Sequence, residues 1–295
     1  MPNTLYISDL DGTLLDNGAR LADRCRTTLC ELLADGLPFT IASARSVSSI
    51  AMMLKGVPIT LPVVEFNGAF LSDLATGRHE IVNGIERAIV EDLHELLPRF
   101  GVAPFISTFD GTVDRLFYKD VLNEGMEWYR DDRVAVGDKR LCATDDLSCV
   151  FDHDVVCVTI IGHEPPLAEL HAAIAERHGD HVELHRYEND YSPGWHWLTV
   201  HDRRATKDQG IRVLRDRYGL ADHELVVFGD HHNDVKMFAL ADRAVAVANA
   251  IDAVKACATV VIGSNVEGSV PEFIRNDWTP GVEKGSRKWG LGSKE

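Results

Sequence analysis

The sequence predicts an α/β protein built on a doubly wound parallel sheet, with a second, α+β unit inserted into it. Two observations support this prediction. Short, continuous apolar runs alternate with helix-like segments in the first and last thirds of the chain, which is typical of parallel strands covered on both faces. The middle third instead groups β-prone stretches around two helix-like segments. We therefore expect a core of residues 1–83 and 203–295 and an inserted unit of residues 84–202.

The first third supplies three expected strands separated by helices. Residues 4–8 are apolar and β-prone, and this run stops at Asp9. Apolar side chains then recur at helical spacing from Leu21 to Leu33, and Gly36 is suited to end that helix. Beyond it we expect a strand over 38–42, a helix over 46–55 and a strand over 61–66 that ends at the turn dipeptide Asn67-Gly68.

The last third repeats this alternation after the inserted unit. Thr206 is suited to cap a helix that begins at Lys207. Three apolar strands are expected over 225–228, 244–248 and 259–262, and helical segments follow the last two.

The middle of the chain has a different order of expected helices and strands. An amphipathic helix is expected over 86–100, followed by β-prone stretches that Asp110-Gly111 interrupts. A strand over 155–162, a helix over 165–178 and two strands over 181–187 and 196–201 complete the inserted unit.

Composition limits the kinds of partner. The chain has 295 residues and a formal net charge of −16, so its surface repels nucleic acid and anionic membranes. No apolar stretch reaches the roughly 18 to 20 residues of a membrane span. No basic start precedes an apolar segment, and the six cysteines form no CxxC pair, so we expect a cytoplasmic protein with reduced thiols. The sequence leaves open whether the protein is a monomer or a homodimer. An anionic substrate would need local positive charge at its site.

The first chemical pattern is Asp9-Leu10-Asp11-Gly12-Thr13, directly after the first strand. Ligands of open α/β sheets bind at the carboxyl ends of the strands, so both carboxylates are expected there. One acid can attack a substrate while the other manages a proton. Taken alone, the string is as compatible with an ordinary turn that contains acids.

Three further patterns fall at the same edge of the predicted sheet. Gly229-Asp230-His231-His232-Asn233-Asp234 follows an apolar strand and adds oxygen ligands of the kind that Mg²⁺ prefers. Lys207 begins a helix beyond the insertion and can neutralise a phosphate. Ser43 follows another strand and offers a hydroxyl and an N–H group. Each pattern alone has an ordinary structural reading, but their shared position favours one site.

These motifs resemble the haloacid dehalogenase superfamily of phosphohydrolases, in the Cof-like branch with a large α/β cap. Asp9 to Thr13 is similar to the first motif of that family, Ser43 to its second, Lys207 to its third, and Asp230 with Asn233 and Asp234 to its fourth. The turn Asn67-Gly68-Ala69 also recurs in this branch. The resemblance covers residues 1–83 and 203–295 and implies a Rossmann-like core, with residues 84–202 as a cap that selects the substrate.

The resemblance also implies a role for each matching residue. Asp9 is the expected nucleophile, which forms an aspartyl-phosphate, and Asp11 the acid and base. Mg²⁺ is expected on the carboxylates of Asp9 and Asp230 and the backbone carbonyl of Asp11, with Asp234 supporting these ligands. Ser43, Ala44, Lys207 and Asn233 are expected to bind the phosphoryl group. The second motif of the family usually reads Thr-Gly-Arg, and here it is Ser43-Ala44-Arg45. The pair His231 and His232 is also unusual, and these residues can be ordinary loop residues, tune the substrate fit or bind a softer metal.

The predicted function is therefore a Mg²⁺-dependent phosphatase of a small phosphorylated metabolite, such as a sugar phosphate. A phosphomutase shares the aspartyl-phosphate chemistry and stays open as an alternative, as does a non-catalytic, ligand-binding regulator. In the inserted unit, Arg186, Tyr187, His196 and Trp197 lie close together in the expected strands and are candidates either for substrate contact or for ordinary packing. The sequence does not name the substrate.

Overall fold

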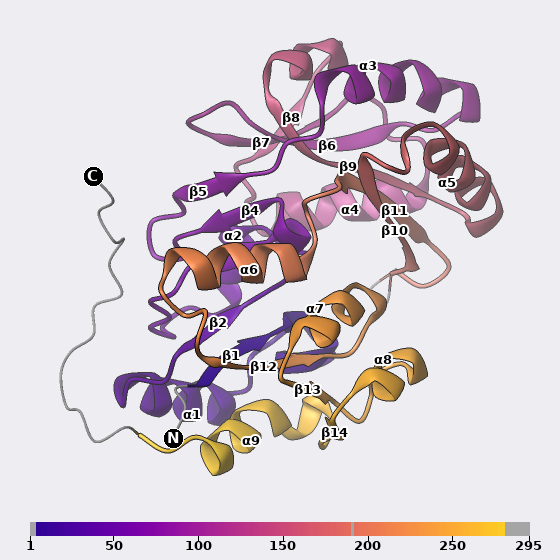
Figure 1. Cartoon of the computed structure of the whole chain (residues 1–295). Coiled ribbons are helices and arrows are strands. Elements are labelled where there is room, and N and C mark those ends of the chain that lie inside the picture. Colours follow the sequence, from indigo (N-terminus) through magenta and orange to yellow (C-terminus); the bar gives the residue numbers. More distant parts are fainter. Residues whose placement is uncertain (1–3, 190–191, 281–295) are drawn as a thin grey trace. The chain divides into compact units, whose positions relative to one another are not determined.

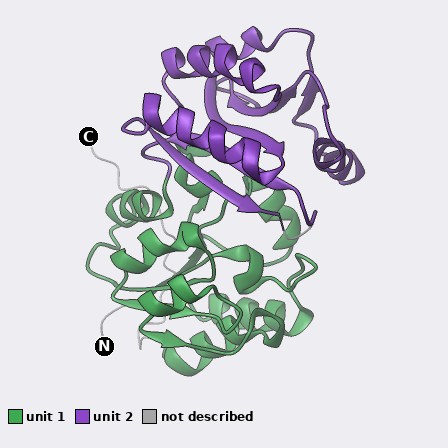
Figure 2. Ribbon diagram, turned by 90° about the vertical axis from the view of Figure 1, so that its right-hand side faces the viewer, with its two compact units in different colours: residues 1–81, 206–295 green, residues 82–205 purple. Residues whose placement is uncertain are grey.

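The computed structural model describes residues 4–189 and 192–280, which form two compact units. Unit 1 contains residues 1–81 and 206–295, and unit 2 contains residues 82–205 (Figure 2). Each unit has its own apolar core. The two divisions of the chain lie two and three residues from the boundaries expected after residues 83 and 202.

The main sheet of unit 1 is parallel throughout, in the strand order β14-β13-β12-β1-β2. The central strand β1 pairs with β12 on one side and with β2 on the other, so that Ile7 lies opposite both Val227 and Thr40. A parallel bridge from Ala42 to Val64 links this sheet to a small one in the order β3-β4-β5. The strands are β1 (Thr4–Ser8), β2 (Phe39–Ile41), β3 (Val63–Glu65), β4 (Phe70–Ser72), β5 (His79–Val82), β12 (Glu224–Gly229), β13 (Arg243–Ala246) and β14 (Val260–Val261).

Helices cover both faces of the main sheet, which confirms the doubly wound α/β fold. In Figure 1, α1 and α9 pack together on one face of the sheet, and α6 packs against α7 on the other. This double coverage explains why the strand residues Leu225 to Phe228 are completely buried. The helices are α1 (Asp23–Ala34), α2 (Val47–Met53), α6 (Lys207–Arg217), α7 (Val235–Leu240), α8 (Asp252–Cys257) and α9 (Ser269–Asp277).

Unit 2 is built on a six-stranded sheet in the order β10-β11-β9-β6-β7-β8. Its neighbouring strands are antiparallel except for β7 and β8. Successive side chains of a strand point to opposite faces, so Leu198 packs with α3 and α5 while Trp197 packs with α4. The elements are α3 (Arg87–Leu96), β6 (Pro104–Phe109), β7 (Asp114–Tyr118), α4 (Glu124–Ala135), β8 (Leu141–Ala143), β9 (Asp154–Gly162), α5 (Glu164–His178), β10 (Val182–Glu188) and β11 (His196–Asp202).

The structure adds elements that the sequence did not predict and corrects one detail. Helix α4 escaped prediction because its only buried residues, Gly125 and Met126, lie in its first turn, so no apolar stripe runs along it. The strands β4, β5 and β8 have only three or four residues each. Thr206 is the N-cap residue of α6, which begins at Lys207 as expected, but the Thr206 side chain makes no capping hydrogen bond.

Candidate active site

Asp9 is the first residue after the central strand β1. Its N–H group donates to the carbonyl of Phe228 at 2.9 Å, which fixes it at the carboxyl end of the sheet. The chain then forms a single turn over Leu10–Leu14, in which Gly12 has a φ of 70°. A Cβ atom on Gly12 would lie 2.3 Å from Oδ2 of Asp230. Backbone angle and space therefore both require glycine beside the two carboxylates.

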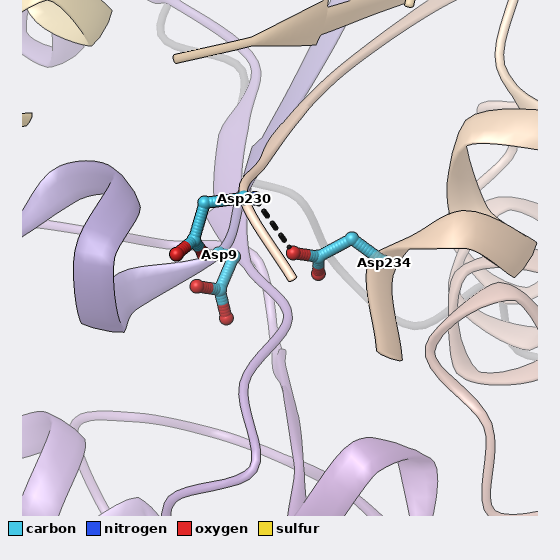
Figure 3. Close-up of side chains that lie close together, drawn as sticks. All are labelled: Asp9, Asp230 and Asp234. Atoms are coloured by element: carbon cyan, nitrogen blue, oxygen red, sulfur yellow. Dashed lines mark hydrogen bonds between the residues drawn. The ribbon is translucent and has the colours of Figure 1, made fainter. Parts of the chain in front are cut away.

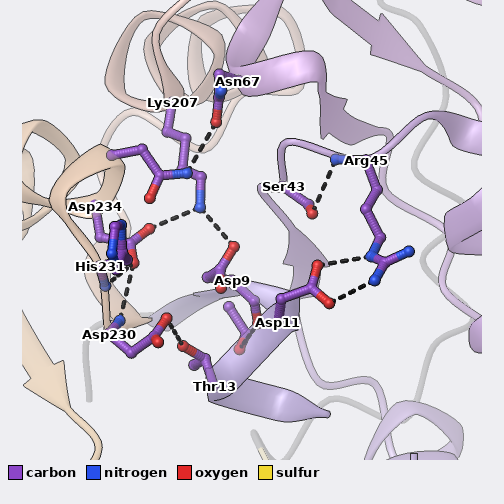
Figure 4. Close-up of polar contacts among 12 residues, drawn as sticks. Asp9, Asp11, Thr13, Ser43, Arg45, Asn67, Lys207, Asp230, His231 and Asp234 are labelled. Atoms are coloured by element: carbon purple, nitrogen blue, oxygen red, sulfur yellow. Dashed lines mark hydrogen bonds and ion pairs between the residues drawn. The ribbon is translucent and has the colours of Figure 1, made fainter. Parts of the chain in front are cut away.

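Lys207, the first residue of α6, is a buried cation that joins two carboxylates. Its Nζ atom donates to Oδ1 of Asp9 at 2.5 Å and to Oδ1 of Asp234 at 2.7 Å (Figure 4). Burial of the ammonium opposes its charge, but the carboxylates of Asp234 and Asp9 outweigh burial and raise the pKa of Lys207. The lysine thus stays charged and holds one oxygen of Asp9 in place.

Asp234 organises the loop that follows β12. While Oδ1 accepts from Lys207, Oδ2 accepts the backbone N–H groups of Asp230 at 2.9 Å and His231 at 3.0 Å. The side chain of His231 in turn accepts the N–H group of Asp234, which completes a capping box. A Cβ atom on Gly229 would lie 2.6 Å from Cγ of Asp234, so glycine is needed for this close approach.

Asp9, Asp230 and Asp234 form a cluster of acids whose ligand atoms lie within 4.8 Å of one another (Figure 3). Burial, reinforced by Asp234, raises the pKa of Asp230 to about 7. Burial also raises the pKa of Asp9, because the opposing effect of Lys207 is smaller. A divalent cation would offset this repulsion, and carboxylate oxygens suit Mg²⁺. Since donors already engage both oxygens of Asp234, Asp9 and Asp230 are the better metal ligands.

Thr13 and Asn67 support opposite sides of this cluster. The Thr13 hydroxyl donates to Oδ1 of Asp230 at 3.0 Å. Asn67 has a φ of 56°, and its Oδ1 accepts from Nδ2 of Asn233 at 3.0 Å. Next to Asn67, a Cβ atom on Gly68 would lie 2.5 Å from the carbonyl oxygen of Thr206. This tight contact holds the Asn67 turn against the residue that precedes Lys207.

The second acid, Asp11, forms a two-pronged ion pair with Arg45. The Nε atom of Arg45 lies 2.6 Å from Oδ2 of Asp11, and its Nη2 atom lies 2.7 Å from Oδ1. Ser43, on the same turn, is buried, and its hydroxyl accepts the N–H group of Arg45 at 3.2 Å. The backbone of Ser43 is fixed by 2.9 Å hydrogen bonds to Val64 and Asn67, and the intervening Ala44 is exposed.

Two asparagines that the sequence analysis did not single out brace the turn after Asp9. Asn249 donates from Nδ2 to the carbonyl of Gly12 at 2.7 Å, and its Oδ1 accepts the N–H group of Asn265 at 3.0 Å. Asn265 donates from Nδ2 to the carbonyl of Leu15 at 2.9 Å. Both follow apolar strands of the main sheet, so the rule that pointed to Asp9 and Asp230 could have found them.

The four polar and aromatic candidates of unit 2 do not form one cluster. Arg186 is ion-paired with Glu164, and Nε2 of His196 lies 3.8 Å from the same carboxylate. Tyr187 and Trp197 belong instead to the aromatic group that packs with α4. His232, in the loop of unit 1, is exposed.

Comparison with known proteins identifies the family. The sequence model of the haloacid dehalogenase-like hydrolases matches residues 6–274, a range that contains all the residues of the acidic cluster. The chain belongs to this family. The resemblance to the haloacid dehalogenase superfamily is confirmed, and so is the expected hydrolase class. Among the described residues of this haloacid dehalogenase-like hydrolase, no helix is long and apolar enough to cross a membrane.

A curated relative matches nearly the whole chain, and solved structures share its fold. The 5-amino-6-(5-phospho-D-ribitylamino)uracil phosphatase YitU of Bacillus subtilis is 26% identical over 274 residues, covering 92% of this chain and 96% of YitU. A haloacid dehalogenase-like hydrolase of Bacteroides thetaiotaomicron is similar in structure, with a TM-score of 0.78, 21% identity, and coverage of 93% and 99%. The protein TM0651 of Thermotoga maritima has a TM-score of 0.76, 24% identity, and coverage of 95% and 99%.

Proposed function

We propose that the protein is a Mg²⁺-dependent phosphatase that moves the phosphoryl group of a small metabolite first to Asp9 and then to water. The observation that carries this proposal is the position of Asp9 at the end of β1, with Oδ1 held by the buried Lys207. A carboxylate fixed in this way keeps its other oxygen for attack on phosphorus. The phosphatase named among its relatives supports the same reaction class.

Asp11 supplies the proton chemistry in this proposal. As the bond from phosphorus to the leaving oxygen breaks, the carboxylic acid of Asp11 gives its proton to that oxygen. The resulting carboxylate then takes a proton from the water that attacks the aspartyl-phosphate, which restores Asp9 and releases inorganic phosphate. Its partial exposure suits this role, because the Asp11 side chain is 35% accessible.

The phosphoryl group would be held by four residues from three segments. Lys207 offers positive charge, Ser43 its hydroxyl, Asn233 its amide and the exposed Ala44 its backbone. Mg²⁺ would be held by the carboxylates of Asp9 and Asp230 and the backbone carbonyl of Asp11. The ion supplies positive charge that lowers the repulsion between these acids and the anionic substrate. Asp234 would keep Lys207 and the Asp230 loop in position.

The proposed substrate is a phosphorylated sugar, sugar alcohol or similar small organophosphate. The name of YitU describes a phosphorylated ribityl chain, which makes phosphorylated polyols the first compounds to try. The core offers groups for the phosphate but little for the rest of a substrate. We therefore propose that unit 2 acts as a cap that selects among phosphate esters.

A screen of phosphorylated metabolites with Mg²⁺ present, measuring released phosphate, tests this function. Release without an added bisphosphate activator separates a phosphatase from a phosphomutase. Absence of release from every compound would favour a ligand-binding regulator. Excess chelator should remove the activity, and Mg²⁺ should restore it; activity that persists in chelator would contradict the metal requirement.

A further inference from the structure

Arg45 occupies a position in the site that the proposed reaction leaves unused. Its guanidinium group binds both oxygens of Asp11, at 2.6 Å and 2.7 Å. This parallel arrangement is the strongest form of a carboxylate ion pair, and it fits a phosphate group equally well. Figure 4 shows Arg45 on the side of Asp11 where Ser43 also lies.

The ion pair conflicts with the proton transfer assigned to Asp11. A carboxylate that accepts hydrogen bonds from Arg45 on both oxygens presents no O–H group to a leaving oxygen. The pair must therefore open, at least in part, before Asp11 can give a proton to the substrate. When the pair opens, the guanidinium of Arg45 loses its strongest contact, so an anion that binds with the substrate is suited to replace Asp11 as its partner.

The phosphate site of the proposed reaction lies next to Arg45 in the chain. Arg45 is two residues from Ser43, and the two are joined by the hydrogen bond from the Arg45 N–H group to the Ser43 hydroxyl at 3.2 Å. A phosphate held by Ser43 is therefore close to the backbone of Arg45, from which its side chain extends. The ion pair is also accessible, since the side chain of Arg45 is 19% exposed and that of Asp11 is 35% exposed.

We propose that Arg45 exchanges partners during the reaction, pairing with Asp11 in the free enzyme and with the phosphate of the bound substrate. This inference rests on the proposed phosphatase function and adds a residue and a binding step to it. The exchange releases Asp11 only when a phosphate is present. Substrate binding and proton donation are thereby coupled through one side chain.

Binding of inorganic phosphate to the Mg²⁺-loaded protein tests the exchange without relying on turnover. Asp11→Asn removes the anion that competes for Arg45, so phosphate should bind roughly tenfold more tightly. Arg45→Ala should bind phosphate roughly tenfold more weakly than the wild type. The combined variant should show no gain over Arg45→Ala alone, because the gain acts through Arg45.

Any other set of phosphate affinities among these variants would contradict the exchange of partners. A gain from Asp11→Asn that persists without Arg45 reflects general repulsion by Asp11, and absence of a gain means that the two anions do not compete. Unchanged phosphate binding in Arg45→Ala removes Arg45 from the phosphate site.

Arg26→Ala is the matched structural control. Arg26 donates to the carbonyls of Lys55 and Met53 at the far end of α2, so this variant loosens α2 without touching Asp11. It should bind phosphate like the wild type, and a loss equal to that of Arg45→Ala would show a merely structural effect. Arg45→Lys, which keeps the charge, should recover part of the binding. Phosphate release by the wild type in the metabolite screen judges the proposed function separately.

Discussion

The two units place their charged side chains in different ways. In unit 1, Asp9, Lys207 and Asp234 are buried and come together from segments far apart in the chain. In unit 2, the ion pairs of Arg87 with Glu91 and of Arg177 with Asp92 lie at the accessible surface, and the largely buried pair of Arg140 with Asp138 joins residues only two apart in the chain. Among the described residues, the candidate metal cluster is found only in unit 1.

The type of sheet explains this difference. Parallel strands all end at one edge, so the residues that follow β1, β2 and β12 meet there and can form a buried polar site. The antiparallel strands of unit 2 send alternate side chains to opposite faces, where helices cover them with apolar contacts. This contrast agrees with the proposal that the reaction takes place in unit 1 and that unit 2 selects the substrate.

The largest expected difference between the units comes from changing one carboxylate to an amide in each of them. Asp9→Asn should lower phosphate release by at least about 10³-fold, because an amide does not form the aspartyl-phosphate. Asp92→Asn, a change of the same kind at the surface of unit 2, should leave turnover unchanged. Turnover and circular dichroism of both variants check this contrast, and an active, folded Asp9→Asn protein would disprove the nucleophile.

A second comparison of the two units uses one glycine with positive φ from each, changed to alanine. Gly12→Ala should lower turnover roughly 100-fold, because the new Cβ would meet Asp230 at 2.3 Å and displace it. Gly111, in the β6–β7 hairpin of unit 2, has a φ of 90°, and no atom of the described residues lies within 4 Å of the place that a Cβ would take there. Gly111→Ala should therefore cost only about 1 kcal/mol of unfolding free energy with turnover intact. Equal losses of turnover would contradict the special role of Gly12.

A smaller effect is expected from the asparagines that support loops. Asn249→Ala should reduce turnover about tenfold, since the Gly12 carbonyl loses its 2.7 Å donor and the turn after Asp9 loosens. Asn123→Ala removes the side-chain cap of α4 in unit 2 and should cost about 1 kcal/mol of unfolding free energy. Turnover of Asn123→Ala with a minimal phosphate ester should match the wild type. Steady-state kinetics and denaturant unfolding measure both effects.

The smallest effect is an opposite response of the units to acid. In the metal-free protein, burial raises the pKa of Asp230 to about 7, so its contribution makes unit 1 more stable as pH falls from about 7 toward 4. Burial lowers the pKa of His201 in unit 2 to about 3, with His185 adding to the shift. Below about pH 6.5, His201 is protonated in the unfolded chain but stays neutral in the folded protein. The unfolding free energy of unit 2 therefore decreases as the pH falls.

Hydrogen exchange of amides in each unit between pH 7 and pH 5 should separate these responses. One proton changes the unfolding free energy by at most about 1.4 kcal/mol per pH unit. His201→Gln should flatten the response of unit 2 alone, and Asp230→Asn that of unit 1 alone. A shared response of both units to either variant would show that they do not unfold separately.

Sequence patterns predicted the residues at strand ends better than the contacts between them. Asp9, Ser43 and Asp230 were predictable because each directly follows an apolar run, and parallel topology brings such positions together. The ion pair of Asp11 with Arg45 was not predictable from the sequence, because it depends on the directions in which the two side chains point.

Two further failures have physical reasons. Asn249 follows an apolar strand, so its position was predictable, but its partner is a backbone carbonyl, and that contact leaves no pattern in the sequence. Arg186 and Tyr187 looked like one cluster, but consecutive residues of a strand face opposite sides, and the strand separates them.

The central position of β1 has a consequence for synthesis on the ribosome. One neighbour of β1, strand β2, emerges soon after it, but the other, β12, begins at Glu224. At about 5 to 20 residues per second, roughly 10 to 40 seconds pass before β12 is made. During that time all of unit 2 is translated, while β1 has an unpaired edge that other strands can join. The native pairing of β1 is therefore completed only after the whole inserted unit has been made.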